Sequence, residues 1–108
     1  MIYKIRFSPL AQKDMDKVWD DVFEASKEID VASKYVEDFI QVILGKKEYP
    51  ESGIPLCYRG LFTGYYSVNF KAYKAFYRIK EIYIEILRIF MMKQDYIKIL
   101  FENPDSDK

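Results

Sequence analysis

The sequence contains no histidine and a single cysteine, Cys57, among its 108 residues. Without histidine, the chain cannot build Ser-His-Asp or Cys-His catalytic sites or any histidine-ligated metal site. One cysteine cannot form an internal disulfide, and there is no cysteine cluster for zinc. Any proton transfer must therefore use carboxylates, lysine, tyrosine, arginine or water, and we expect neither a metal nor a cofactor.

Long apolar runs are also missing. None reaches the ~18 residues that are needed to cross a bilayer, and the N-terminus lacks the apolar segment of a signal peptide. We therefore expect a cytoplasmic protein without a membrane partner. Because half of the residues (50%) are apolar and 31% are charged, a folded core is expected. The length suits one domain, predicted over residues 1–102, followed by a polar tail at residues 103–108.

The formal net charge is zero, but the charges are unevenly distributed. Residues 10–48 hold six lysines and ten acidic residues, whereas residues 55–100 hold eight basic and three acidic residues. The second half can therefore form a surface that binds anions. The alternative is that these charges only keep the faces solvated.

The first part of the chain predicts a strand and two helices. Residues 2–7 are typical of a short strand. Ser8 and Pro9 predict the start of a helix, because serine is a good N-cap and proline suits the first helical turn. Apolar residues then recur at helical spacing over residues 11–22 and, more regularly, over residues 32–44. Two such helices joined by a short loop predict a helical hairpin.

The second part predicts strands. Prolines and glycines break residues 48–64 into loop and turns. The apolar period then changes to two, which predicts strands over residues 65–70, 74–79 and 82–92 in an antiparallel meander. Arg88, an isolated charge among isoleucines, indicates a bulge or a strand end near that position.

The predicted fold is therefore α+β with two layers. The N-terminal helical hairpin packs on one face of a mainly antiparallel four-stranded sheet. A short C-terminal helix after residue 95 is expected to carry Tyr96, Ile97, Leu100 and Phe101. Residues 56–61 can form a short extended piece, which is not counted among the four strands.

Four short motifs occur in a fixed order along the chain. They are YKIRFSPLA at residues 3–11, YPESGIPL at residues 49–56, YKAFYRI at residues 73–79, and LRIF followed by KQDY within residues 87–96. Together with the order of elements, they resemble the RelE/ParE superfamily of toxins from bacterial type II toxin–antitoxin systems, over residues 3–101. The resemblance implies a plasmid-stabilisation-like toxin that arrests growth and is neutralised by a cognate antitoxin.

The resemblance leaves the target open. RelE-like members cleave mRNA in the ribosomal A site, which would make the chain an endoribonuclease that uses no metal and no histidine. ParE-like members inhibit DNA gyrase and trap it on cleaved DNA, without being enzymes. A third alternative is a non-toxic relative that keeps only the fold and antitoxin binding. The chain has Met91-Met92-Lys93 where the family commonly has Tyr/His-Gly-Arg.

Cleavage of the RelE type needs cations fixed near a phosphate and a group that moves a proton. The resemblance implies these candidates: Lys74, Arg78, Arg88 and Lys93 as cations, and Tyr96 as a proton donor or base-stacking ring. Lys74 and Arg78 lie four residues apart on one strand, which separates them by about 13 Å. They cannot contact one phosphate together unless the chain bends, but they can follow a nucleic-acid backbone.

Each candidate also has a purely structural interpretation. The two lysines are then solvated surface residues, and the tyrosine is a core ring. Arg78 would be an ion-pair partner of Glu81, Glu85 or a helix acid. Arg88 would reach the sheet edge or pair with a buried carboxylate.

Overall fold

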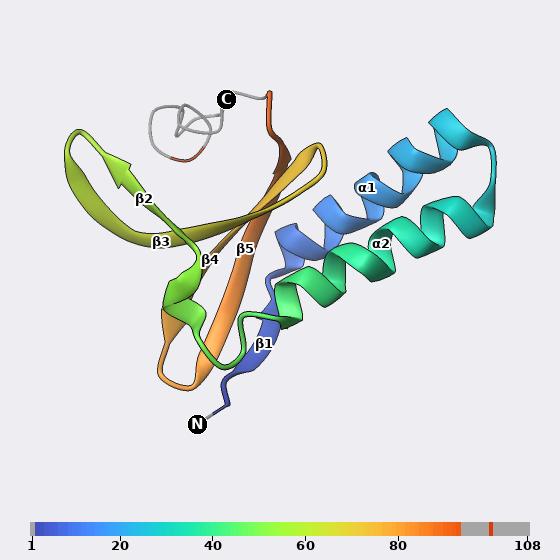
Figure 1. Cartoon of the computed structure of the whole chain (residues 1–108). Helices are drawn as coiled ribbons and strands as arrows, with labels where there is room; N and C mark the ends of the chain where they lie inside the picture. Colours follow the sequence, from blue (N-terminus) through green and yellow to red (C-terminus); the bar gives the residue numbers. More distant parts are fainter. Residues whose placement is uncertain (1, 94–99, 101–108) are drawn as a thin grey trace.

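The computed structural model describes residues 2–93 and residue 100, and this part of the chain forms two long helices and five strands (Figure 1). The elements are β1 (Lys4–Phe7), α1 (Pro9–Ser26), α2 (Ile29–Leu44), the 3-10 turn η1 (Pro50–Ser52), β2 (Ile54–Tyr58), β3 (Leu61–Phe70), β4 (Tyr73–Lys80) and β5 (Tyr83–Met91). The predicted C-terminal helix, apart from Leu100, and the tail at residues 103–108 lie outside the described residues. No helix among the described residues is long and apolar enough to cross a membrane.

The sheet has five strands in the order β1-β5-β4-β3-β2, so the prediction of four strands is wrong. The additional strand is β2, which pairs antiparallel with residues 61–67 of β3, for example Pro55 with Tyr66 and Tyr58 with Leu61. This segment is rich in proline and glycine, and the sequence predicts loop and turns there with only a short extended piece over residues 56–61. Proline is tolerated there because β2 is an edge strand, where a missing N–H need not break the ladder.

The opposite edge of the sheet is β1, which pairs parallel with β5, from Lys4 with Tyr83 to Phe7 with Ile86. The other three pairs of neighbouring strands are antiparallel. The sheet is therefore mixed but mainly antiparallel, and β5 lies beside the first strand of the chain.

The start of α1 follows from the sequence. Ser8 is the N-cap of α1, and its hydroxyl accepts a hydrogen bond of 3.0 Å from the N–H of Ala11, while Pro9 occupies the first turn. α1 ends at Ser26, and its C-cap residue Lys27 adopts a left-handed conformation (φ 61°). The Trp19 indole donates a hydrogen bond of 3.2 Å to the Ser33 hydroxyl and links the two helices. The predicted helix start at Ser8-Pro9 is confirmed.

Both helices cover one face of the sheet, and the turn that joins them extends beyond it (Figure 1). The core between the layers contains Met15, Val18, Phe39, Ile43, Val68, Ala75, Tyr77, Ile84, Ile86 and Ile89. The ring of Phe39 stacks on that of Phe70 with centroids 4.9 Å apart. The large apolar area removed from water in this layer is the main source of stability.

A bulge in β5 shifts its register with β4. Tyr77 pairs with Ile86 and Phe76 pairs with Arg88, so Leu87 is the extra residue. On a regular strand, residues three apart face opposite sides of the sheet. The extra residue of the bulge shifts the alternation by one position, so Ile86 and Ile89 both belong to the core. The irregularity predicted near Arg88 is confirmed.

Candidate functional site: the open face of the sheet

The charged residues of the strands lie on the side of the sheet that faces away from the helices. This side is here called the open face. By register and alternation, it carries every charged residue of the five described strands. The basic ones are Lys4, Arg6, Lys74, Arg78, Lys80 and Arg88, and the acidic one is Glu85. The helices have the opposite balance, with three basic and eight acidic residues. The charge asymmetry of the sequence is therefore also an asymmetry between the two layers.

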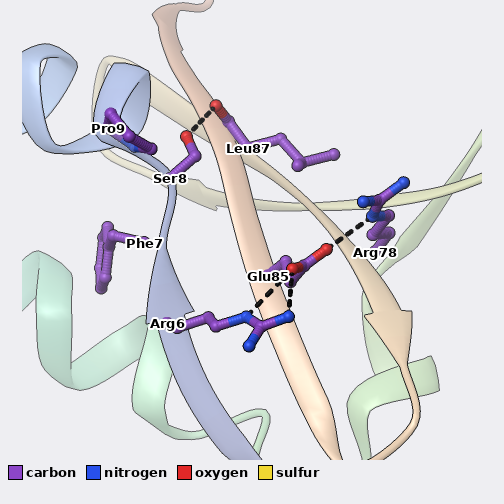
Figure 2. A pocket seen from close by; sticks show the side chains of 7 residues that line it. All are labelled: Arg6, Phe7, Ser8, Pro9, Arg78, Glu85 and Leu87. Carbon is purple, nitrogen blue, oxygen red and sulfur yellow. Dashed lines mark hydrogen bonds and ion pairs between the residues drawn. The ribbon is translucent and has the colours of Figure 1, made fainter.

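Three of these residues form a row across neighbouring strands. Arg6 of β1 lies opposite Glu85 of β5, which lies opposite Arg78 of β4. The Arg6 Nε and a terminal nitrogen donate to Glu85 Oε2 at 3.0 and 2.6 Å, and the Arg78 Nε donates to Oε1 at 2.7 Å. Figure 2 shows the two guanidinium groups approaching the carboxylate from opposite sides. Of the alternative ion-pair partners that the sequence offered for Arg78, namely Glu81, Glu85 or a helix acid, the structure shows Glu85.

The two arginines also set the protonation of the carboxylate between them. Hydrogen bonds from Arg78 and then from Arg6 lower the pKa of Glu85, against a smaller opposing effect of burial. Glu85 is therefore ionised at neutral pH. The Arg6 guanidinium also lies 4.0 Å from the centre of the Tyr83 ring, which holds it by a cation–π contact. Because two cations share one anion, the row keeps a net positive charge.

A pocket of about 300 Å³ opens at this row. It is lined by Arg6, Phe7, Ser8, Pro9, Arg78, Glu85 and Leu87, as Figure 2 shows. The Ser8 hydroxyl donates to the Leu87 carbonyl oxygen at 2.9 Å, which fixes the start of α1 against the bulge. Arg6 is the member that the sequence analysis missed, since its partner is 79 residues away. The signal that was available is its alternation with Ile5 and Phe7, which places it opposite the core.

Arg88 has a different environment. Its guanidinium contacts the Asp14 carboxylate of α1 through two hydrogen bonds of 2.8 and 3.2 Å. Asp14 also accepts a hydrogen bond of 2.9 Å from the N–H of Ile89. Beyond Phe7, β1 no longer covers β5, so Asp14 satisfies a backbone donor at the exposed strand edge as well as the arginine. The predicted pairing of Arg88 with a carboxylate is confirmed.

Lys74 and Lys93 lie toward the other end of the sheet. Lys74 is on the open face with Arg78, as predicted, and burial lowers the pKa of its ammonium group. Lys93 follows β5 near the β3–β4 turn, where the Met92 N–H donates to the Ala72 carbonyl oxygen at 2.8 Å. Tyr96 lies outside the described residues. The catalytic roles of all five candidates stay predictions.

The described residues of the open face form no metal-binding cluster. Among residues 2–93 and 100, no group of three His, Cys, Asp or Glu side chains is placed to hold an ion. Two aromatic rings, Phe76 and Phe90, lie among the charges and pack edge to face with centroids 6.0 Å apart. Both rings are buried, at 1% and 4% exposed, so what the described face offers a ligand is guanidinium and ammonium donors.

An acidic helical pair on one face of a mixed sheet, with the basic residues on the other face, defines a small α+β class of protein. The family model of the ParE toxin of the type II toxin–antitoxin system, parDE, matches residues 5–96. The chain belongs to this family and is a toxin of a type II toxin–antitoxin system. This agrees with the resemblance found in the sequence motifs.

Solved structures have the same fold. The chromosomal ParDE toxin–antitoxin system of P. aeruginosa matches with a TM-score of 0.70 and 19% identity, covering 85% of this chain and 98% of that chain. The RelBE2 toxin–antitoxin complex of Mycobacterium tuberculosis matches with a TM-score of 0.61 and 20% identity, covering 84% of this chain and 99% of that chain. A comparison with curated proteins found no match.

Proposed function

We propose that this toxin acts on DNA gyrase in the ParE manner, without catalysis of its own, and that a cognate antitoxin protein neutralises it. The match of the ParE toxin family model to residues 5–96 carries the proposal. The ParE-like members of the superfamily inhibit gyrase by trapping it on cleaved DNA. We expect the protein to act in the cytoplasm, where both partners would be found.

The arrangement of the cations also favours inhibition over RNA cleavage. Cleavage of the RelE type needs several cations converging on one phosphate. Here Arg88 is held by Asp14 at the edge of β5, and Arg78 is held by Glu85. Lys74 lies four residues from Arg78 along β4, or about 13 Å. These three cations are therefore not gathered around one point.

A gyrase assay with the purified chain tests the proposal. We expect it to inhibit DNA supercoiling and to increase the amount of cleaved DNA that remains bound to gyrase. In cells, induction is expected to activate the SOS response while translation initially continues. Co-expression of a cognate antitoxin is expected to abolish both effects.

The competing functions predict other outcomes. Translation-dependent mRNA cleavage that Lys74→Ala and Lys93→Ala both reduce, with gyrase unaffected, would replace the proposal with the RelE-like function. Binding of the antitoxin without any effect on gyrase, mRNA or growth would indicate the non-toxic relative. Glu81→Gln, an exposed change in the β4–β5 turn, is a suitable control in each assay.

A further inference from the structure

The hairpin of β2 and β3 extends beyond the rest of the sheet. β3 begins at Leu61, but its pairing with β4 begins only at Tyr65. Residues 61–64 therefore pair with β2 alone. Figure 1 shows this part of the hairpin extending away from both helices. The two-stranded segment of residues 56–64, here called the ribbon, is thus a protrusion of the sheet.

The ribbon has a defined shape. Its two turn residues, Arg59 and Gly60, both have positive φ, at 54° and 81°, as in the type I′ turns that suit the twist of a hairpin. The Thr63 hydroxyl donates a hydrogen bond of 2.7 Å to the Leu56 carbonyl oxygen across the ribbon. The Arg59 guanidinium lies 5.2 Å from the centre of the Tyr58 ring. A partner would therefore meet an element that is already ordered, which lowers the entropic cost of binding.

The end of the ribbon exposes apolar side chains on both of its faces. Leu61 is 74% exposed and Phe62 is 52% exposed. Because successive side chains of a strand point to opposite faces, these two neighbours point to opposite sides of the ribbon. A single exposed apolar residue is ordinary, but two adjacent ones at the end of a protrusion form a contact surface. A partner that covers both must enclose the end of the ribbon, which requires a pocket and not a flat surface.

The charge around the ribbon indicates which kind of pocket fits. Residues 52–80 include no aspartate or glutamate and five basic residues, and within residues 54–64 the single charged residue is Arg59, at the turn. An acidic rim on the partner complements this charge. Duplex DNA fits less well, because affinity for a phosphate backbone grows with the number of cations that contact it, and the ribbon itself provides one.

We propose that the end of the ribbon inserts into an apolar pocket with an acidic rim on the protein target of the toxin, with Leu61 and Phe62 inside the pocket and Arg59 at its rim. This rests on the proposed function, which makes gyrase that target. Arginine and aromatic side chains that fill pockets carry much of the binding energy of protein interfaces. The ribbon would then hold the target, and its loss would abolish inhibition without unfolding the toxin.

The apolar part is tested with two variants of nearly equal shape, Leu61→Val and Leu61→Thr. Both residues are β-branched and suit a strand. Binding of the full chain to gyrase is measured by biolayer interferometry without DNA, and growth arrest is measured after induction in cells. We expect Leu61→Thr to bind at least about fivefold more weakly than Leu61→Val, because its hydroxyl would be buried in an apolar pocket. Ile29→Ser, a 62% exposed apolar residue of α2, should bind like wild type.

The charged part and the enclosure are tested separately. Arg59→Gln is expected to bind about threefold more weakly and with a smaller salt dependence, whereas Arg59→Lys keeps the charge and most of the affinity. Lys13→Gln, an exposed residue of α1, is the control. Cys57 is exposed and lies opposite Phe62, so a bulky maleimide on its thiol is expected to prevent insertion. The same reagent should not affect binding of Cys57→Ser, which has no thiol.

Urea unfolding shows that a variant is folded, and we expect the wild-type midpoint for each because the end of the ribbon is exposed. Equal binding and equal growth arrest by Leu61→Thr and Leu61→Val would overturn the inference. A difference between them that needs DNA to be present would assign the ribbon to DNA and overturn it as well.

Failure of the proposed function gives a different result, namely a wild-type chain that does not bind gyrase. Growth arrest then decides about the ribbon. Arrest that Leu61→Thr loses and Leu61→Val keeps would support insertion into another protein target, whereas arrest by both would overturn it. A wild-type chain that neither binds gyrase nor arrests growth would overturn both proposals.

Discussion

The hydroxyl of Tyr77 donates a hydrogen bond of 2.5 Å to the carbonyl oxygen of Pro50, and Gly53 lies directly against the same hydroxyl. Tyr77 is fully buried in the middle of β4. This contact ties the loop before β2 to the centre of the sheet. It explains how a segment rich in proline and glycine is fixed well enough to provide an edge strand.

The first prediction concerns the space at Gly53. A Cβ there would collide with the Tyr77 hydroxyl and lie 3.0 Å from the Ser67 carbonyl oxygen. Because the ring is buried and cannot move aside, Gly53→Ala is expected to lower the free energy of unfolding by about 1–3 kcal/mol. Urea denaturation followed by circular dichroism measures this change.

Two variants show whether the collision is the cause. Gly45→Ala serves as the control, because the nearest atom to its Cβ would be the Val42 carbonyl oxygen at 3.2 Å, and we expect a smaller effect. Adding Tyr77→Phe to Gly53→Ala removes the hydroxyl and should recover part of the lost stability. A Gly53→Ala variant as stable as wild type would contradict the predicted close contact.

The second prediction is a loss of stability at high pH. Burial raises the pKa of Tyr77 to about 12, and burial together with Asp21 raises the pKa of Tyr73 to about 12. The unfolded chain releases these protons near pH 10, so their contribution is complete below pH 10 and is lost as the pH rises from 10 to 12. Urea unfolding at pH 9, 10 and 11 should show this fall.

The matching control removes one phenol at a time. Tyr73→Phe is expected to be less stable than wild type at neutral pH, because Tyr73 donates a hydrogen bond of 3.3 Å to Asp21. Its stability should nevertheless fall less steeply above pH 10. An unchanged slope in both Tyr73→Phe and Tyr77→Phe would show that other groups cause the alkaline loss.

Local patterns in the sequence were sufficient for most of the elements. The Ser8-Pro9 start, the helical spacing over residues 32–44 and the irregularity near Arg88 each depend on neighbours within a few residues, and all three agree with the structure. The failure was β2, where Pro55 and nearby glycines are typical of loop. Its strand conformation depends on pairing with β3 and on the Tyr77 contact, neither of which leaves a local pattern.

The site was harder to predict for the same reason. Arg88 in an apolar strand indicated the need for a carboxylate, but not that Asp14, 74 residues away, would provide it. Arg6 joined the site only because β1 lies parallel beside β5. Two parallel strands are joined by a long crossover, so no short turn in the sequence indicates their register.

The third prediction concerns Asp14. Asp14→Asn weakens the ion pair with Arg88 and the hydrogen bond to the Ile89 N–H. Since all three groups are partly buried, we expect unfolding to become easier by about 1–3 kcal/mol. Asp16→Asn, on the exposed side of the same helix, should change stability by no more than about 0.5 kcal/mol. Equal losses in both variants would mean that the contact contributes nothing specific.

The fourth prediction is that Glu85 makes the fold sensitive to acid. Arg78 and Arg6 hold the pKa of Glu85 below its usual value of 4.5. This stabilising contribution is therefore complete above that pH and is lost as the pH falls through the lower folded-state pKa. Glu85→Gln should be less stable than wild type at pH 7, because Arg6 and Arg78 then repel each other, and the difference should shrink at pH 3. Thermal unfolding of both proteins at the two pH values measures this. Glu81→Gln, in the exposed turn, is the control and should be as stable as wild type at both pH values. If the stability lost in Glu85→Gln were the same at pH 3 and pH 7, the carboxylate would act through packing and not through its charge.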